Sequence, residues 1–131
     1  MKRFTQTRTA GPGDIDELGH VNNAVWVKWI QDIAVAHWNA VASETQRDAY
    51  FWVVTRHEID YRGNVGVGET VTGETWVADE GPRGARFDRH VRFTGADGQV
   101  KVEALTTWAM IDRASGRLAR VQADIAAPFL D

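Results

Sequence analysis

The residues best suited to chemistry lie in the stretch GDIDELGHVNNAVW, residues 13–26, directly before a long apolar segment. Asp16 supplies a carboxylate and His20 supplies an imidazole. A carboxylate, an imidazole and an oxyanion donor are the minimum set for hydrolysing an activated acyl group. In that chemistry Asp16 acts as nucleophile or general base, and the stretch is a candidate catalytic site.

The oxyanion donor is expected where a helix begins, at Asn22 and Asn23. The first N–H groups of a helix have no partner inside it, and they lie at the positive end of the helix dipole. A substrate carbonyl placed there would meet a ready oxyanion site. Asn22 and Asn23 are therefore candidate contacts of the substrate.

The same residues also have a purely structural interpretation. Asn22 or Asn23 is a good N-cap for the helix. Asp14 and Asp16 are typical of turns in a glycine-containing loop. Residue types and spacing leave the catalytic and the structural interpretation both open.

Other kinds of catalytic site are excluded by what the sequence lacks. It contains no cysteine, which removes thiol nucleophiles, disulfides and cysteine–zinc sites. Ser43 and Ser115 are the only serines, and neither stands in a G-x-S-x-G elbow. The four histidines are not paired at metal-ligand spacing, so we expect neither a metal nor another cofactor.

Composition predicts an ordinary globular protein. With 131 residues the chain is expected to form one domain, residues 1–131. A net charge of −3 does not indicate a nucleic-acid-binding surface. The first residues lack the apolar core of a signal peptide, and no apolar run is long enough to span a membrane. We therefore expect a cytoplasmic protein with no nucleic-acid or membrane partner.

The hydrophobic pattern predicts one long helix among strands. Residues 22–43 are apolar around most of the helix, whereas the segments after them alternate with a period of two. In the first of these segments, Phe51, Val53, Ile59 and Tyr61 are expected on one face, opposite Glu58 and Asp60. Strands are predicted at residues 3–9, 51–62, 69–78, 85–94, 99–112 and 118–121, and a short helix at 122–129.

These elements predict an α+β fold. A helix with so little polar surface needs apolar cover on most sides, which a strongly curved sheet supplies. We therefore expect a curved antiparallel sheet of five to six strands wrapped around one long central helix. Such a sheet has an open edge, which favours dimerisation by strand pairing.

The sequence also resembles a known family. DIDELGHVNNAVW resembles the signature D-x-D-x-x-G-H-V-N-N-x-x-Y of the hot-dog-fold acyl thioesterases, the 4-hydroxybenzoyl-CoA thioesterase-like enzymes and the plant acyl-carrier-protein thioesterases. RHEIDYRGNVGVGETVTGETWV and WAMIDRASGRLARV resemble later parts of that family's pattern. Nearly the whole chain is covered, and the implied hot-dog fold agrees with the predicted architecture.

The resemblance implies catalytic residues and an assembly. Asp16 matches the catalytic aspartate, Asn23 matches the residue whose backbone N–H polarises the thioester carbonyl, and His20 matches a histidine that orients water or substrate. It implies a homodimer or homotetramer with sites at the subunit interface, and no cofactor. Leu18 and Trp26 depart from the family, which has asparagine and tyrosine there.

The resemblance further implies an acyl-CoA or acyl-carrier-protein thioester as substrate. Trp26 is a candidate acyl contact, although core packing is the alternative. Glu58 is a candidate that reaches the partner's site. Arg83 and Arg86, with Arg89 near them, are candidates for the phosphates of the carrier. Arg113, Arg117 and Arg120 form a second candidate set, and solvated surface is the alternative for all of these charged residues.

Four functions are compatible with these residues. We favour hydrolysis of acyl-CoA-type thioesters to free acid and CoA, with an acyl-carrier-protein thioesterase as a variant. A non-catalytic acyl-CoA-binding module would bind without turnover. A hot-dog dehydratase would need a different arrangement of histidine and carboxylate. A purely structural protein would leave Asp16 and Asn23 with capping alone.

Overall fold

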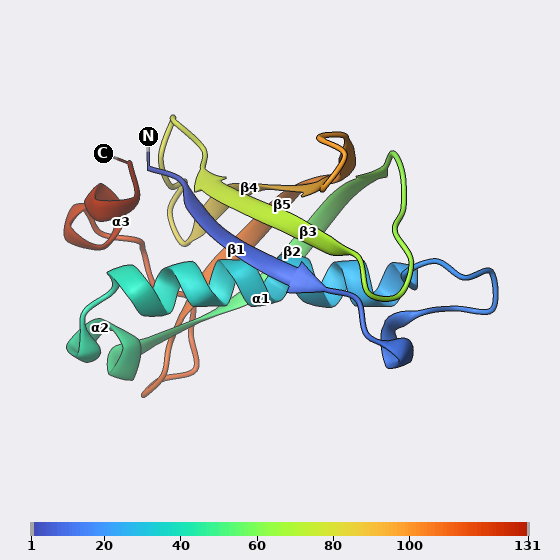
Figure 1. Cartoon of the computed structure of the whole chain (residues 1–131). Coiled ribbons are helices and arrows are strands. Elements are labelled where there is room, and N and C mark those ends of the chain that lie inside the picture. Colours follow the sequence, from blue (N-terminus) through green and yellow to red (C-terminus); the bar gives the residue numbers. More distant parts are fainter. Residues whose placement is uncertain (1, 131) are drawn as a thin grey trace.

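The computed structural model describes residues 2–130 as three α-helices, a short 3-10 helix and five strands. No helix among these residues has the length and apolar character needed to cross a membrane. In chain order (Figure 1) the elements are β1 Phe4–Thr9, the 3-10 helix Pro12–Asp14, α1 Asn23–Val41, α2 Glu44–Ala49, β2 Tyr50–Tyr61, β3 Thr70–Val77, β4 Arg86–Gly95, β5 Val100–Asp112 and α3 Ala123–Leu130.

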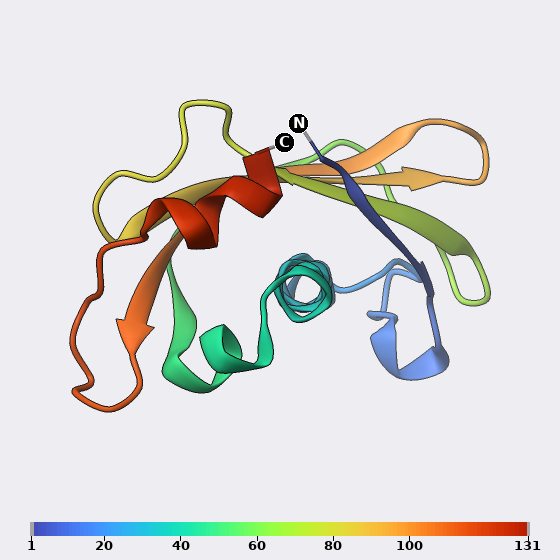
Figure 2. The ribbon, with the colours of Figure 1, turned by 90° about the vertical axis from the view of Figure 1, so that its left-hand side faces the viewer.

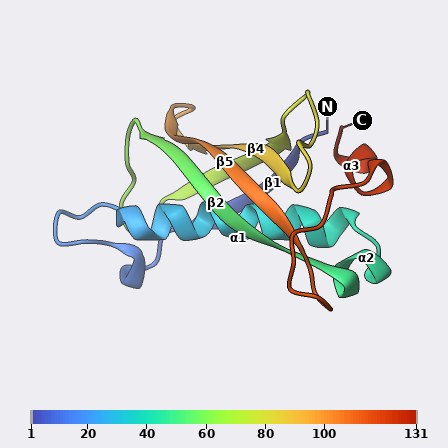
Figure 3. The ribbon, with the colours of Figure 1, turned by 180° about the vertical axis from the view of Figure 1, so that it is seen from behind.

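The strands form one antiparallel sheet in the order β1-β3-β4-β5-β2. Seen along the axis of α1, the sheet arches over one side of the helix (Figure 2). The expected α+β hot-dog architecture is thereby confirmed, with five strands. Strand β2 forms one edge of the sheet, and from behind it crosses α1 (Figure 3).

Large apolar side chains hold α1 against the sheet. Its buried residues are Trp26, Trp29, Ile30, Ile33, Ala34, His37 and Trp38. Fully burying one large apolar side chain contributes roughly 1.5–3 kcal/mol. Gly73 on β3 allows the close approach, because a Cβ there would lie 2.6 Å from Cε1 of Phe93 and 2.9 Å from Cδ1 of Ile33.

The other side of α1 is not covered by the sheet. Ala24, Lys28 and Val35 are exposed along it, and Val35 keeps 46% of its surface accessible. Figure 2 shows this side facing away from the strands. The helix is therefore covered on fewer sides within one chain than its apolar sequence predicts.

Two local predictions were wrong. Val53 is 38% exposed instead of sharing the buried face with Ile59. The cause is a register shift between Val54 and Arg56, where β2 has one residue more than its partner β5, so the inward and outward positions exchange. Residues 118–121 form no strand, because only Leu118 makes a bridge, to Ile111.

The limits of both helices and strands were predicted closely, and each of the five strands lies within one residue of its predicted range at either end. α1 begins one residue after its N-cap Asn22 and ends at Val41, close to the predicted range 22–43. The terminal helix α3 was also predicted correctly. Helix α2 was not predicted, although Ser43 and Gln46 form a capping box at its start.

Candidate active site

Asp16 lies in the loop between the 3-10 helix and α1, where its carboxylate organises the backbone. Its Oδ1 accepts hydrogen bonds from the N–H groups of Leu18, at 2.9 Å, and His20, at 3.2 Å. Its own N–H donates to the carbonyl of His20 at 2.8 Å. Oδ2 accepts no hydrogen bond from residues 2–130. One carboxylate oxygen thus fixes the loop, and the other is available to a substrate or water.

The start of α1 has one free backbone donor. The side chain of the N-cap Asn22 accepts a hydrogen bond from the N–H of Ala24 at 2.8 Å. The Asn22 carbonyl accepts from the N–H groups of Val25 and Trp26. The N–H of Asn23 has no acceptor in the part of the chain that the structure describes. Asn23 is therefore the amide at this helix end that can bind an oxyanion.

The residue between loop and helix, Val21, fixes both in place. Val21 is 1% exposed, and its N–H donates to the Val65 carbonyl at 3.1 Å and to Oδ1 of Asn64 at 3.0 Å. The N–H of Asn22 also donates to the carbonyl of Asp14 at 2.9 Å. The connection between β2 and β3 therefore holds the Asp16 loop beside the start of α1.

The remaining residues of the loop differ in what they contact. The His20 side chain is exposed, and its ring makes no hydrogen bond with any described residue. Asp14 accepts from the N–H of Gly11 at 2.9 Å, which fits a turn residue. Leu18 is 77% exposed, so its apolar side chain is available to another molecule. The loop therefore brings Asp16, His20 and the Asn23 N–H to one end of α1.

Trp26 lies in the core. It is 0% exposed, and its ring packs against Trp29 and Phe93 at centroid distances of 5.2 and 5.6 Å. It is not among the residues that line either of the cavities described below. Within one chain its contacts are those of a core residue.

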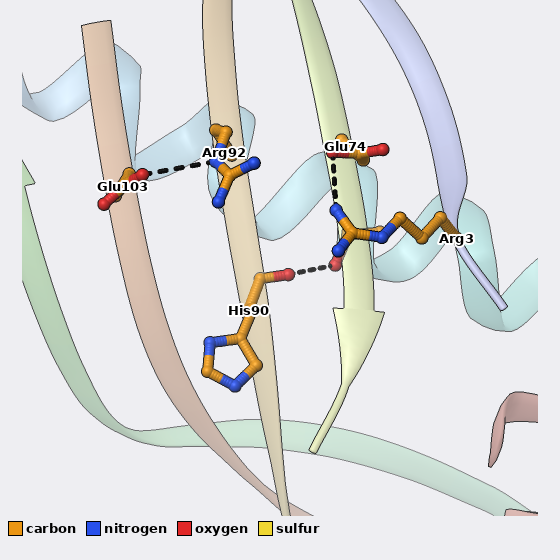
Figure 4. A network of polar contacts seen from close by, with 6 residues as sticks. Arg3, Glu74, His90, Arg92 and Glu103 are labelled. Atoms are coloured by element: carbon orange, nitrogen blue, oxygen red, sulfur yellow. Dashed lines mark hydrogen bonds and ion pairs between the residues drawn. The ribbon is translucent and has the colours of Figure 1, made fainter. Parts of the chain in front are cut away.

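Glu58 lies on the outer face of the sheet, away from α1, and pairs with Arg56. It borders a hollow with Asp60 and His90. Figure 4 shows the neighbouring part of this face, where Arg3 pairs with Glu74 at 2.8 Å and Arg92 pairs with Glu103 at 3.2 Å. A single chain does not bring Glu58 to the Asp16 loop.

Of the three neighbouring arginines of β4 and its preceding turn, Arg83 and Arg86 are joined by two backbone hydrogen bonds, whereas Arg89 lies on the inward face. Arg83 pairs with Asp88 at 2.7 Å, and this ion pair lowers the pKa of the Asp88 carboxyl. Arg86 is exposed. Arg89 is 8% exposed, in the inward row that also contains Phe87 and Val91. Arg83 and Arg86 remain candidates for surface contacts, whereas Arg89 belongs to the interior.

A cavity of about 250 Å³ lies beside the second half of α1. Its aromatic lining residues are Trp38, Tyr50, Phe51, Trp52, Phe87, Trp108 and Phe129. Ala34 and Val35 of α1 also contribute to its wall. A cavity with these walls suits an apolar acyl group.

Arg89 lines this cavity and is held by two acceptors. Its Nη1 lies 2.7 Å from Nδ1 of His37 and 3.1 Å from Oγ1 of Thr75. Burial, together with the Arg89 charge, lowers the pKa of His37 to about 4. His37 is therefore neutral near pH 7, with Nδ1 as the acceptor of the Arg89 hydrogen bond. Burial also lowers the pKa of Arg89, to about 10, which leaves the guanidinium charged.

The Asp16 loop and the aromatic cavity lie apart on one chain. From Asn23 to Ala34, the first cavity residue on α1, is about 16 Å at 1.5 Å per residue. Sequence reasoning missed the cavity, because its walls come from all three α-helices and from four strands. The inward position of Arg89 did have a signal, because Arg89 alternates with Phe87 and Val91 in the predicted strand 85–94.

Comparison with known proteins gives a family match. Residues 10–129 match the model of the thioesterase-like superfamily. One curated relative is the chloroplastic acyl-acyl-carrier-protein hydrolase FATB3 of Cuphea viscosissima, 27% identical over 74 residues. The match takes in 56% of this chain and 18% of that protein, so this chain spans less than a fifth of its relative's length.

Solved structures share the fold. The hypothetical protein SAV2348 from Staphylococcus aureus, in complex with CoA, superposes with a TM-score of 0.83 at 18% identity, over 95% of this chain and 79% of that chain. A putative oleoyl thioesterase from Lactobacillus plantarum gives a TM-score of 0.85 at 18% identity, over 98% of this chain and 50% of that chain. At these identities the likeness concerns the fold.

Proposed function

The chain belongs to the thioesterase-like superfamily, and on that premise we propose that it hydrolyses acyl thioesters, with Asp16 and the N–H of Asn23 at the reacting carbonyl. The observation that carries this proposal is the pairing of two free groups at one end of α1. One is Oδ2 of Asp16 and the other is the Asn23 N–H, each without a partner among residues 2–130.

In the proposed reaction, the Asn23 N–H donates a hydrogen bond to the thioester carbonyl oxygen. This bond strengthens as negative charge develops on that oxygen, and the positive end of α1 adds to it. Asp16 takes a proton from a water molecule whose oxygen bonds to the carbonyl carbon. The carbon–sulfur bond then breaks, and the sulfur leaves with a proton as the free thiol.

Asp16 also fits direct attack on the carbonyl, which forms an anhydride that water then opens. Both routes need the same free oxygen in nearly the same place, and both give one acid and one thiol. His20 is exposed in the same loop, and its proposed role is to orient water or the leaving thiol.

We further propose that the site is completed by a second copy of the chain. β2 is an edge strand, and α1 has an exposed side that includes Val35. Antiparallel pairing of two β2 strands about a two-fold axis would set both helices on the same face, running in opposite directions. The Asp16 loop of one copy would then lie beside the aromatic cavity of the other.

Coenzyme A is the proposed carrier, with Arg83 and Arg86 as predicted contacts of its phosphates. A carrier-protein thioester is the second candidate, because the Cuphea relative is named as an acyl-carrier-protein hydrolase. The two carriers present the same thioester to Asp16, so the mechanism above applies to either.

The test is release of free thiol from a panel of aliphatic and aromatic acyl-CoAs and from acyl-carrier proteins. We expect turnover with at least one acyl-CoA. Turnover of acyl-carrier proteins alone would assign the second carrier. Tight binding of acyl-CoA without thiol release would contradict hydrolysis and would favour a non-catalytic binding module.

A further inference from the structure

The cavity beside the second half of α1 holds a positive charge that nothing in the described chain neutralises. Arg89, Arg47 and Arg113 all line it, and none of them forms an ion pair among residues 2–130. The carboxylate in the lining, Asp88, is occupied by Arg83 and by the hydroxyl of Thr107 at 2.7 Å.

Arg89 differs from the other two because it is buried. Arg47 and Arg113 donate to backbone carbonyls near the ends of α1 and α2. Arg89 is 8% exposed and lies among aromatic rings, with its guanidinium carbon 5.8 Å from the ring centre of Phe129. A buried charge without a counter-charge is costly for a fold, so its presence needs a reason beyond packing.

The hydrogen bonds of Arg89 leave one edge of the guanidinium unused. Nη1 donates to Nδ1 of His37 and to Oγ1 of Thr75, while Oγ1 of Thr75 donates onward to the carbonyl of His90. Nε and Nη2 donate to no acceptor in the described part of the chain. These two nitrogens form the edge of a guanidinium that binds a carboxylate through two parallel hydrogen bonds.

We propose that the cavity binds an acyl group ending in a carboxylate, and that Arg89 receives this carboxylate through its Nε and Nη2 edge. The aromatic walls hold the apolar spacer between the thioester carbonyl and the carboxylate. The inference rests on the proposed thioester hydrolysis, and it names the acyl class: thioesters of dicarboxylic acids. Arg89 is then a specificity-determining residue.

The geometry explains how selectivity would arise. His37 and Thr75 fix Nη1, so the guanidinium is oriented before a ligand arrives. A terminal carboxylate supplies the missing counter-charge, whereas a methyl end leaves the buried cation unpaired. A site built around a buried polar group discriminates against the analogue that lacks the matching group.

The first experiment compares matched pairs of acyl-CoA, adipyl-CoA against hexanoyl-CoA and suberyl-CoA against octanoyl-CoA, by thiol release. We expect kcat/KM to favour the dicarboxylic member by about 10- to 100-fold. Arg89→Met should remove or reverse this preference. Arg3→Met, on the outer face of the sheet, is the matched control and should keep it.

The second measurement needs no turnover. Titration of the wild-type protein with free adipate should raise its melting temperature, whereas hexanamide, which has no carboxylate, should raise it less at the same concentration. Arg89→Lys keeps the positive charge but cannot donate two parallel hydrogen bonds to one carboxylate. We therefore expect it to bind adipate more weakly than wild type. This measurement keeps the inference testable if Arg89→Met fails to fold.

The two experiments separate this inference from the proposed function. Thiol release with equal or lower kcat/KM for the dicarboxylic members would overturn the inference while leaving hydrolysis intact. Thiol release from no thioester would overturn hydrolysis, and the adipate titration would still decide whether the cavity binds a carboxylate. Equal effects of adipate and hexanamide on the wild-type melting temperature would overturn that binding.

Discussion

The two halves of α1 face different surroundings. At its N-terminal end, Asp16 and His20 lie in an accessible polar loop that precedes Asn23. Their free groups and the Asn23 N–H are the proposed reacting groups. Beside its C-terminal half, Arg89 and His37 are buried among aromatic rings around a cavity. The first region holds the proposed reacting groups, and the second holds an aromatic cavity whose carboxylate, Asp88, is paired with Arg83. This difference teaches that one chain presents the parts of a site separately, as expected if two copies complete it.

The largest expected effect is on kcat, from a substitution in the Asp16 loop at the N-terminal end of α1. Asp16→Asn should lower kcat for thioester hydrolysis by about 10³-fold, because the amide can neither attack the carbonyl nor take a proton. Its Oδ1 still accepts from Leu18 and His20, so the loop should keep its structure. Thiol release measures the activity, and thermal unfolding measures the fold.

Asp14→Asn is the matched control for this substitution. The Asp14 side chain accepts only from the N–H of Gly11 among the described residues, and an amide oxygen does the same. We expect activity within a few-fold of wild type. Equal losses in both variants would show that the loop, and not the Asp16 carboxylate, is responsible for turnover.

The buried residues beside the C-terminal half of α1 should instead affect how the free energy of unfolding depends on pH. The pKa of His37 is about 4 in the fold and 6.5 as its ordinary value. The unfolded chain therefore takes up this proton first, so the stability falls as the pH drops from 6.5 to about 4. The expected loss from His37 is about 3 kcal/mol. Burial lowers the pKa of His57 as well, which acts in the same direction.

Denaturant unfolding of wild type and His37→Gln across this range isolates the contribution of His37. The carboxylates titrate in both proteins, so their effect cancels in the difference. We expect the wild type to lose about 3 kcal/mol more than the variant between pH 7 and pH 4. A difference that does not change with pH would contradict a buried, neutral His37 beside Arg89.

The smallest expected effect concerns the helix start. Asn22→Ala removes the acceptor for the N–H of Ala24 and should cost about 1 kcal/mol of stability. We expect a several-fold lower kcat, because the neighbouring Asn23 N–H loses its fixed orientation. Asn22→Ser keeps a capping oxygen and should retain both stability and activity. A fully active Asn22→Ala variant would argue against an oxyanion donor at Asn23.

Much of this molecule could be predicted from its sequence, including α1 and the curved antiparallel sheet, whereas details that depend on exact strand pairing or on contacts between distant elements could not. The loop and α1 are encoded by neighbouring residues, so the cap at Asn22 and the helix range followed from the pattern. The face of Val53 was mispredicted because the extra residue in β2 is defined only by pairing with β5. The cavity escaped prediction because elements from the whole chain meet around it.

Arg89 illustrates a different limit. Its position in an alternating strand predicts an inward side chain, between Phe87 and Val91. Its charge and its closeness to Arg83 and Arg86 in the sequence instead favour a phosphate contact at the surface. Arg89 can lie in the interior because His37 of α1 and Thr75 of β3 accept hydrogen bonds from its guanidinium. Such partners become visible only once the chain is folded.

The most direct measurement tests whether one site takes Asp16 from one copy of the chain and Arg89 from the other. Asp16→Asn and Arg89→Met chains carrying different tags are co-expressed, and the mixed pairs are purified and assayed with adipyl-CoA. A mixed pair then has one site with both wild-type residues, so we predict about half of the wild-type activity, although each parent is inactive or nearly so. Mixed pairs no more active than the parents would contradict a site that takes Asp16 from one copy and Arg89 from the other.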